Sequence, residues 1–255
     1  MFGTVPKAIW SGLVPADGDN RIRLATRSLI VETDGRTFMV DAGNPDVWPE
    51  KLRRIYDIQN FPIEESGRDP ATITDIVLTH LHFDHSGGIT RNRPEGDGGP
   101  ELRFPNAALY VQADNYELAR HPNPRERASY LRENIQALKR SKLVLTRGSQ
   151  EIFPGIWVHQ SNGHTRGLQW VEVRDGDKSV AFPSDLIPTS HHLPLAFTMA
   201  YDMSAELLLE EKAEFLKRAA AGGWIIVFTH DTHVAAGRVT VDGKGRFVLG
   251  ETVTI

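Results

Sequence analysis

The chain has 255 residues, a net charge of −4 with its histidines counted as neutral, 40% hydrophobic residues and no cysteine. Such a composition can fill a sizeable core, and it excludes disulfides, thiolate metal sites and a basic face for nucleic acid. No apolar run approaches the roughly 20 residues that a membrane span needs, and no N-terminal stretch has the charged-then-apolar pattern of a secretory signal. We therefore expect one cytoplasmic domain over residues 1–255, with neither a membrane nor nucleic acid as a partner.

The first predicted elements are a hairpin and a buried strand. Residues 28–33 and 37–40 have strand-like sequences on either side of Asp34-Gly35, a pair that is typical of a two-residue turn. Residues 76–78 form a short apolar run rich in β-branched side chains, which predicts a buried strand.

Four metal-binding side chains lie within six residues directly after this strand, and Gly87-Gly88 follows them. Strand alternation lets the first two point the same way, and the turn into a helix brings the other two to a second point nearby. A lone His-x-His pair is often a chance surface feature, and an Asp before a helix is often only a cap. Four such residues at this spacing instead favour two metal ions held side by side. They are His80, His82, Asp84 and His85.

A loop and a helix are predicted in the middle of the chain. Residues 92–100 are rich in Gly, Pro and charged residues, which predicts a flexible loop beside the mouth of a pocket. Residues 125–142 predict a mostly polar helix, whose apolar stripe contains Tyr130, Leu131, Ile135 and Leu138.

Three further metal-binding residues, His164, Asp185 and His230, each lie just past a short apolar run in the second half of the chain. A strand-turn-strand pattern at residues 171–173 and 180–182 indicates that these runs belong to a sheet. Because ligands at successive strand ends converge on one rim of a sheet, we expect the three side chains to meet. The runs are residues 156–158, 179–182 and 224–228.

The clearest predicted helix covers residues 206–221. Leu208, Phe215 and Ala219 fall on one side of it, and Gly222-Gly223 ends it. Its start is capped by Asp202 or Ser204. Residues 239–241 and 247–249 then predict a C-terminal hairpin around Asp242-Gly243.

These motifs together resemble the metallo-β-lactamase-fold hydrolases, over nearly the whole of that domain. The match runs from residues 38–43, a strand end that contains Asp41, to His230. The resemblance implies an α/β fold of the αββα sandwich type, and it implies that Asp41 either hydrogen-bonds beside the metal ligands or serves only as a turn residue. It assigns one metal to His80, His82 and His164, the other to Asp84, His85 and His230, and both to Asp185.

Within this superfamily, the chain is most similar to the quorum-quenching lactonase branch. The similarity rests on residues 80–88, on Gly163-His164-Thr165, and on residues 184–189 and 199–202. His82 stands where the flavodiiron branch has Glu, and the β-lactamases proper lack a bridging Asp and commonly use a Cys ligand.

The similarity to this branch has two departures. Pro188 stands where the best-known acyl-homoserine lactonases place a substrate-contacting Tyr, and Tyr201 is a candidate replacement. Residues 1–7 are similar to a segment that follows a first strand in relatives, which leaves open whether that strand is missing here.

The chemistry implied by this ligand set is hydrolysis. A hydroxide that bridges two divalent metals would attack the carbonyl of a lactone ring such as that of an acyl-homoserine lactone. Zn2+ is expected, although Fe, Mn or Co fits the same ligands. Asp84 would also shuttle a proton after ring opening, whereas Ser86 and Ser184 read as loop or capping residues rather than nucleophiles.

We expect a small-molecule substrate and a monomer or homodimer. Phe83, His192 and Tyr201 are candidate substrate contacts, with core packing or a surface loop as the alternative for each. Hydrolysis of organophosphate triesters or aryl esters on the same centre stays open, as does a metal-binding module without catalysis. A thioester hydrolase of the glyoxalase II type is disfavoured, because a hairpin is predicted where that class usually carries a helical domain.

Overall fold

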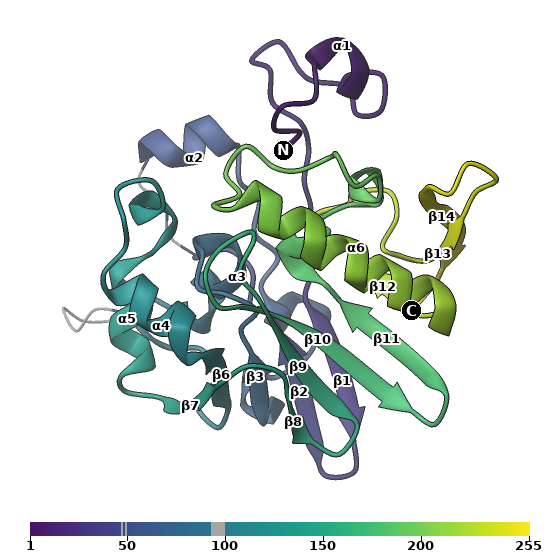
Figure 1. Ribbon diagram of the computed structural model, residues 1–255. Helices are drawn as coiled ribbons and strands as arrows, with labels where there is room; N and C mark the ends of the chain where they lie inside the picture. The colour runs from purple at the N-terminus through teal and green to yellow at the C-terminus, as the bar shows by residue number, and fades with distance from the viewer. Residues whose placement is uncertain (47, 49, 93–99) are drawn as a thin grey trace. The chain divides into compact units, whose positions relative to one another are not determined.

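The computed structural model describes residues 1–46, 48, 50–92 and 100–255. These residues form two compact units, named here unit 1 (Met1–Arg27 with Gly148–Ile255) and unit 2 (Ser28–Arg147). Each unit has its own β-sheet and its own hydrophobic core, and Figure 1 labels helices and strands of both. Most of the loop predicted at residues 92–100 lies outside the described residues, and the single domain over residues 1–255 stays a prediction.

Unit 2 contains a mixed sheet of five strands among the described residues, in the order β1-β2-β3-β6-β7. β1 and β2 form the predicted hairpin, and Gly35 adopts the positive φ of 77° that its turn requires. β2, β3, β6 and β7 run parallel, so their carboxyl ends meet at one edge of the sheet. The strands are β1 (Leu29–Thr33), β2 (Arg36–Val40), β3 (Asp75–Val77), β6 (Ala108–Gln112) and β7 (Lys142–Thr146), with a separate pair β4 (Thr90–Arg91) and β5 (Glu101–Leu102).

Short helices of unit 2 supply part of the core of this sheet. Ile76 and Leu109 from the strands are buried in one cluster with Ile135 and Leu138 from a helix. The α-helices are α2 (Glu50–Tyr56), α3 (Phe83–Ser86), α4 (Ala113–Arg120) and α5 (Arg132–Leu138), and the 3-10 turns are η1 (Ile63–Ser66), η2 (Pro70–Thr72), η3 (Gly87–Ile89) and η4 (Arg127–Ser129).

The helix predicted over residues 125–142 is wrong in extent. The chain forms η4, an extended step at Tyr130, and only the seven-residue α5 before β7 begins at Lys142. Tyr130 makes an isolated antiparallel bridge with His82, and β7 pairs with β6. Pairing with distant residues therefore removes both ends of the predicted helix, while Ile135 and Leu138 of its stripe are buried as expected.

Unit 1 contains a mixed sheet of seven described strands, in the order β14-β13-β12-β11-β10-β9-β8. β11 and β12 are parallel, and the other neighbours are antiparallel. The predicted hairpins β10–β11 and β13–β14 are confirmed. The strands are β8 (Gln150–Phe153), β9 (Ile156–Ser161), β10 (Leu168–Asp175), β11 (Lys178–Phe182), β12 (Ile225–Val227), β13 (Ala236–Val241) and β14 (Phe247–Val253).

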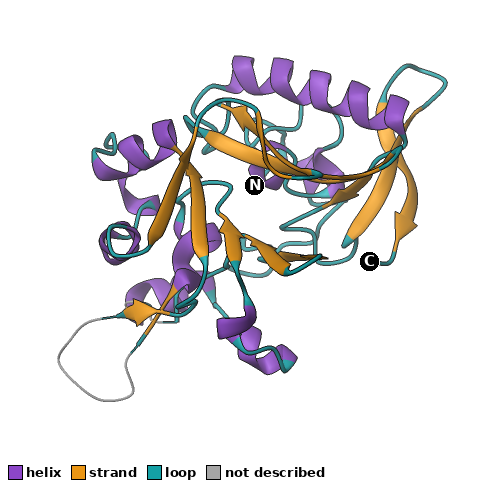
Figure 2. Ribbon diagram, turned by 90° about the horizontal axis from the view of Figure 1, so that it is seen from below, coloured by secondary structure: helices purple, strands orange, loops and turns teal. Residues whose placement is uncertain are grey.

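The long helix α6 (Ala205–Gly222) connects the two parallel strands of this sheet and confirms the helix predicted at residues 206–221. Figure 2 shows it lying along one face of the sheet. Leu208 and Phe215 are buried against the sheet, where each contributes about 1.5–3 kcal/mol to stability. Ser204 is the N-cap residue, although its side chain makes no capping bond, and Gly223 ends the helix in the left-handed conformation. Unit 1 also contains α1 (Lys7–Trp10), η5 (Ser184–Leu186) and η6 (Ser190–His192).

In the described part of the chain, no helix is long and apolar enough to cross a bilayer.

Candidate metal centre

Asp41 ties the ends of two parallel strands together in unit 2. It follows β2 directly, is 2% exposed, and adopts a left-handed φ of 57° that Asp tolerates better than most residues. Its Oδ1 accepts a bond from the backbone N of Thr79 (2.7 Å), and its Oδ2 accepts one from the Thr79 hydroxyl (2.8 Å). Asp41 therefore fixes the backbone just before the predicted metal-binding motif.

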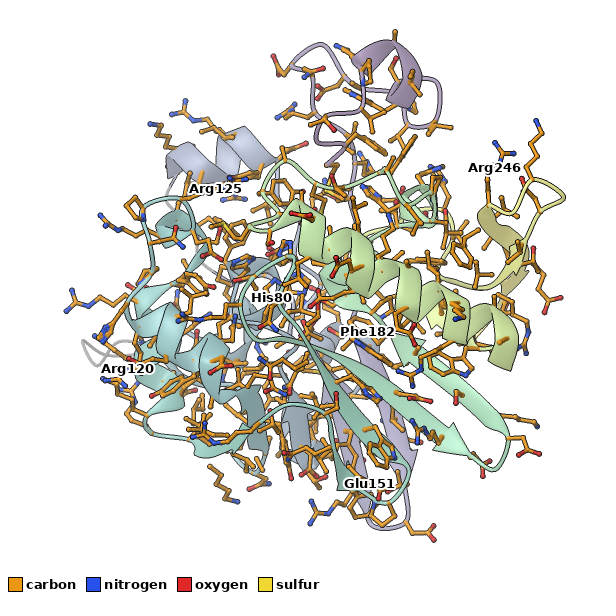
Figure 3. The ribbon with its side chains drawn as sticks, viewed as in Figure 1. His80, Arg120, Arg125, Glu151, Phe182 and Arg246 are labelled. Atoms are coloured by element: carbon orange, nitrogen blue, oxygen red, sulfur yellow. The ribbon has the colours of Figure 1, made fainter. Side chains whose placement is uncertain are left out.

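His80 and His82 follow, and both are buried. The interior position of His80 contrasts with exposed side chains such as Arg120 of α4 (Figure 3). Because the Thr79 hydroxyl donates to Asp41, it accepts from Nδ1 of His80 (3.1 Å), which leaves the lone pair on Nε2. That Nε2 lies 3.1 Å from Nδ1 of His82. Two nitrogens that bind one tetrahedral zinc ion at about 2.0–2.1 Å lie about 3.3 Å apart, so the observed distance suits a shared ion.

His85 and Asp84 complete the group in unit 2, at the start of α3. Nδ1 of His85 donates to Oδ2 of Asp41 (2.8 Å), so its Nε2 presents a lone pair. Asp41 therefore hydrogen-bonds to a predicted ligand, which is one of the two alternatives that the sequence left open for it. Asp84 is 25% exposed, with Oδ2 3.7 Å from Nε2 of His85.

The two glycines after the motif allow backbone to pack against backbone. A Cβ atom on Gly88 would lie 2.0 Å from the carbonyl oxygen of Ala42, and one on Gly87 would lie 2.3 Å from the backbone N of Pro45. Only glycine fits such an approach. The glycines thus press α3 onto the chain that follows β2.

The three predicted ligands of unit 1 also lie together. Nδ1 of His164 donates to Oδ1 of Asp202 (2.8 Å), and Nδ1 of His230 donates to the carbonyl of Ala25 (2.7 Å). Both imidazoles therefore present a lone pair on Nε2. Asp185 lies between them, with Oδ2 3.2 Å from Nε2 of His164 and Oδ1 2.9 Å from Nε2 of His230. A carboxylate with one oxygen toward each of two imidazoles suits a bridging ligand.

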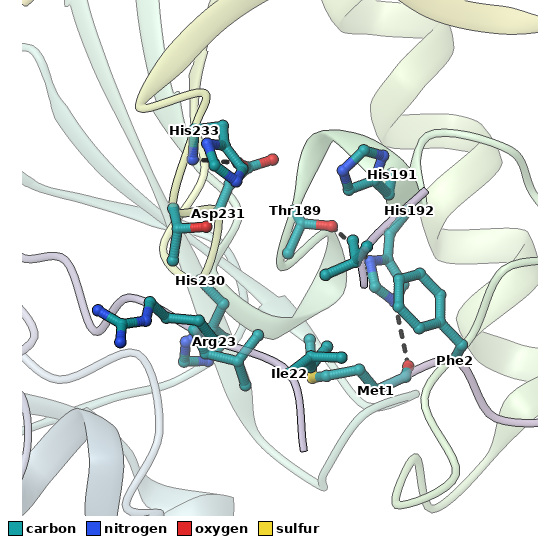
Figure 4. Close-up of a pocket in the computed structure, with 13 residues that line it drawn as sticks. Met1, Phe2, Ile22, Arg23, Thr189, His191, His192, His230, Asp231 and His233 are labelled. Atoms are coloured by element: carbon teal, nitrogen blue, oxygen red, sulfur yellow. Dashed lines mark hydrogen bonds between the residues drawn. The ribbon is translucent and has the colours of Figure 1, made fainter. Parts of the chain in front are cut away.

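A pocket in unit 1 has His230 on its wall (Figure 4). His192 is 1% exposed there, so the surface-loop alternative for this residue is wrong. Its ring stacks on Phe2 at 5.0 Å, its Nε2 donates to the carbonyl of Met1 and its Nδ1 accepts from the Thr189 hydroxyl. Burial lowers the pKa of His192 to about 3, so the ring is neutral near pH 7. The pocket is lined by Met1, Phe2, Val14, Ile22, Arg23, Leu24, Thr189, His191, His192, His230, Asp231, Thr232 and His233.

The other two candidate substrate contacts have different surroundings. In unit 2, Phe83 packs edge-on against Trp48, with ring centroids 4.9 Å apart, and also contacts Tyr56. In unit 1, Tyr201 is 46% exposed and its ring lies edge-on to His164 at 6.3 Å. The substrate roles of Phe83, His192 and Tyr201 stay predictions.

The sequence does not reveal the hydrogen-bond partners of the histidines. Its pattern suggests Asp202 only as a helix cap or as part of the run at residues 199–202, although its carboxylate orients His164. The carbonyl of Ala25 lies 205 positions before His230 and has no side chain that could signal its role. Lys212 of α6 is different, because its unusual burial can be predicted from the sequence. It is a lysine between Leu208 and Phe215 on the apolar helix face that packs on the sheet.

Known proteins with similar sequences include metal-dependent hydrolases. Residues 21–93 match the sequence model of the metallo-β-lactamase superfamily. An N-acyl homoserine lactonase from a Bacillus species is 32% identical over 159 residues, which are 55% of this chain and 54% of that protein. The chain thus spans about half the length of the curated relatives it matches.

Solved structures match over more of the chain. A probable metal-dependent hydrolase from Staphylococcus aureus has a TM-score of 0.88 at 27% identity, and the match covers 100% of this chain and 92% of that one. A dizinc quorum-quenching lactonase, solved with a product of N-hexanoyl-L-homoserine type, has a TM-score of 0.72 at 20% identity, covering 91% of this chain and 81% of that one.

Proposed function

Because the chain belongs to the metallo-β-lactamase superfamily of metal-dependent hydrolases, we propose that its seven predicted ligands form one dinuclear centre that opens lactone rings. The α/β fold predicted from the resemblance is confirmed by the two mixed sheets and by these comparisons. The observation that carries the proposal is the donor set itself. His80, His85, His164 and His230 each have Nδ1 within hydrogen-bond distance of an acceptor, which favours the tautomer whose Nε2 carries the lone pair that binds a metal.

The ligands divide into two groups in this proposal. His80, His82 and His164 bind one ion, Asp84, His85 and His230 bind the other, and Asp185 bridges them. The support for the bridge is that the two oxygens of Asp185 face two different imidazoles. Imidazole and carboxylate donors favour zinc, with iron, manganese or cobalt as alternatives.

The reaction proposed is attack on a lactone carbonyl. When bound, the two ions would supply a water of lowered pKa and positive charge beside the carbonyl oxygen. Asp84, partly exposed beside His85, accepts the proton of the nucleophile and returns it to the ring oxygen as the ring opens. Asp41 and Asp202 keep their imidazoles in the tautomer that binds metal.

The pocket beside His230 supports a neutral, partly apolar substrate. Phe2, Val14, Ile22 and Leu24 contribute apolar side chains to its wall. An acyl-homoserine lactone has this character. Relatives named N-acyl homoserine lactonases further support this substrate class. We infer a preference for longer acyl chains.

A substrate panel on zinc-reconstituted protein tests the proposal. It sets acyl-homoserine lactones of several chain lengths beside δ-lactones, aryl esters and phosphotriesters, with His82→Ala and His230→Ala as inactive controls. We expect two zinc ions per chain, the highest kcat/KM on long-chain lactones, and metal content lowered in Asp185→Ala. A phosphotriester kcat/KM well above that of every lactone would instead assign phosphotriester hydrolysis to the protein. One zinc or fewer per chain would refute the dinuclear centre.

A further inference from the structure

Lys212 is a buried lysine in the apolar face of α6. It is 1% exposed, lies one helical turn from Leu208 and is followed on the same face by Phe215. Burial lowers its pKa to about 7. A buried ammonium is costly unless its donors are used, and here Nζ donates to the backbone carbonyls of Pro194 (2.8 Å), Phe197 (2.8 Å) and Leu195 (3.4 Å).

The segment held by Lys212 carries the carboxylate that orients His164. Residues 194–202 run from the three bound carbonyls to Asp202. The backbone N of Met199 donates to Oδ2 of Asp202 (2.6 Å), and Oδ1 accepts from Nδ1 of His164 (2.8 Å). Lys212 is therefore connected to the imidazole through one short segment.

Glu211, which precedes Lys212 in α6, binds the backbone just before His164. Its carboxylate accepts bonds from the Ser161 hydroxyl (2.5 Å), the backbone N of Asn162 (2.7 Å) and the backbone N of Gly163 (2.9 Å). A Cβ atom on Gly163 would lie 2.5 Å from Cα of Leu208, so this backbone lies directly on the helix. Glu211 thus fixes the three residues that lead into His164.

We propose that Glu211 and Lys212 are a pair of positioning residues for His164. Glu211 fixes the backbone before the histidine, and Lys212 fixes the segment that brings Asp202 to its Nδ1. One helix then sets both the place and the tautomer of this imidazole. The inference rests on the proposed role of His164 as a metal ligand.

Two substitutions with matched controls test this pair. Glu211→Gln and Lys212→Met remove the charged groups, while Glu210→Gln and Lys217→Met make the same changes at exposed positions of the same helix. Zinc affinity is measured by competition with a chelator. We expect each test variant to lose about 10–100-fold in zinc affinity, and the controls to change less than about threefold.

Amide hydrogen exchange in the metal-free protein separates positioning from general destabilisation. Glu211→Gln should accelerate exchange at residues 161–164, and Lys212→Met at residues 195–202, with β10 left unchanged. If Lys212→Met does not fold, Lys212→Gln, which keeps two donors, takes its place. Zinc affinity equal to that of the controls, or exchange that is unchanged in these two segments, would overturn the inference. Failure of the wild-type protein to open lactones would count against the proposed function alone, because zinc affinity and exchange do not depend on the substrate.

Discussion

Asp41 combines an unfavourable backbone conformation with several short hydrogen bonds. A left-handed non-glycine residue costs about 1–2 kcal/mol, and such strain persists where the surroundings hold it in place. Here the bonds to Thr79 and His85 hold it. The strain at Asp41 is therefore coupled to the orientation of a predicted ligand.

Replacing Asp41 should weaken metal binding more than it alters the fold. Asp41→Asn keeps the size of the side chain, but the amide has one acceptor oxygen where the carboxylate has two. Its NH2 group must therefore face a donor, either the backbone N of Thr79 or Nδ1 of His85. We expect zinc affinity to fall about 10–100-fold, measured by chelator competition. Asp34→Asn, in the exposed turn before β2, is the control and should bind zinc as the wild type does.

Gly88 is a second residue at which local packing decides the outcome. Gly88→Ala places a Cβ atom 2.0 Å from the carbonyl oxygen of Ala42, and the bond from its N to the carbonyl of Gly43 (3.1 Å) opposes any shift. We expect a loss of about 1–3 kcal/mol in the free energy of unfolding, measured with urea. Gly18→Ala has open space and should change it by less than about 0.5 kcal/mol, so equal effects at the two sites would contradict the packing argument.

Residue type and spacing are enough to predict the ligands from the sequence. They do not reveal the residues that orient those ligands through hydrogen bonds. Metal-binding side chains in a short motif carry a local signal, as His80 and His82 do. Asp202 and Glu211 are ordinary carboxylates until the fold brings them to the backbone and ring of His164. Their roles depend on contacts across about 40–50 positions, which no local pattern contains.

At the scale of elements, local signals succeeded where they agreed with the tertiary contacts. α6 has an apolar stripe and a terminal glycine pair, and its bounds differ from the prediction by one residue at each end. Residues 125–142 also have a stripe, yet Tyr130 pairs with His82 and the chain from Lys142 joins β6. Helical periodicity alone cannot reveal such competing strand pairs.

Strand β10 contains a buried carboxylate, Glu172, that should make the free energy of unfolding depend on pH. Burial alone would raise the pKa of Glu172, but hydrogen bonds from His159, Arg174 and Ser179 outweigh it and lower the pKa to about 2. A folded-state pKa below the unfolded value of 4.5 means that this stabilisation is complete above about pH 4.5 and is lost as the pH falls toward 2. Its size is on the order of 3 kcal/mol.

Urea unfolding between pH 7 and pH 3 measures this effect. The wild-type protein should lose stability steeply below pH 4.5, and Glu172→Gln should be less stable at pH 7 with a shallower loss toward pH 3. Glu214→Gln, at an exposed position of α6, should follow the wild-type curve. Parallel curves for the wild type and Glu172→Gln would show that Glu172 is not the source.

For the whole molecule, the sequence predicted hairpins in both halves of the chain but not which residues belong to each unit. Met1–Arg27 belongs to unit 1 together with the second half of the chain. Ala25 and Arg27 donate backbone bonds to the carbonyls of His230 and Thr229, about 200 positions away. Motifs and periodicity describe neighbours along the chain, so they could not assign this segment.

Metal removal tests the proposed dinuclear centre at the scale of the whole chain. Its proposed ligands are His80, His82, Asp84 and His85 in the first half of the sequence and His164, Asp185 and His230 in the second. A ligand that binds only the folded state stabilises it by about 4 kcal/mol at a thousand times its Kd, so chelation should lower the Tm. If all seven residues bind the same pair of ions, zinc should slow amide exchange in β3 and in β10 together, and Asp185→Ala should weaken both responses. Protection of β3 alone or of β10 alone would contradict a single centre, since ions held by only one group of ligands would protect only the strands next to that group.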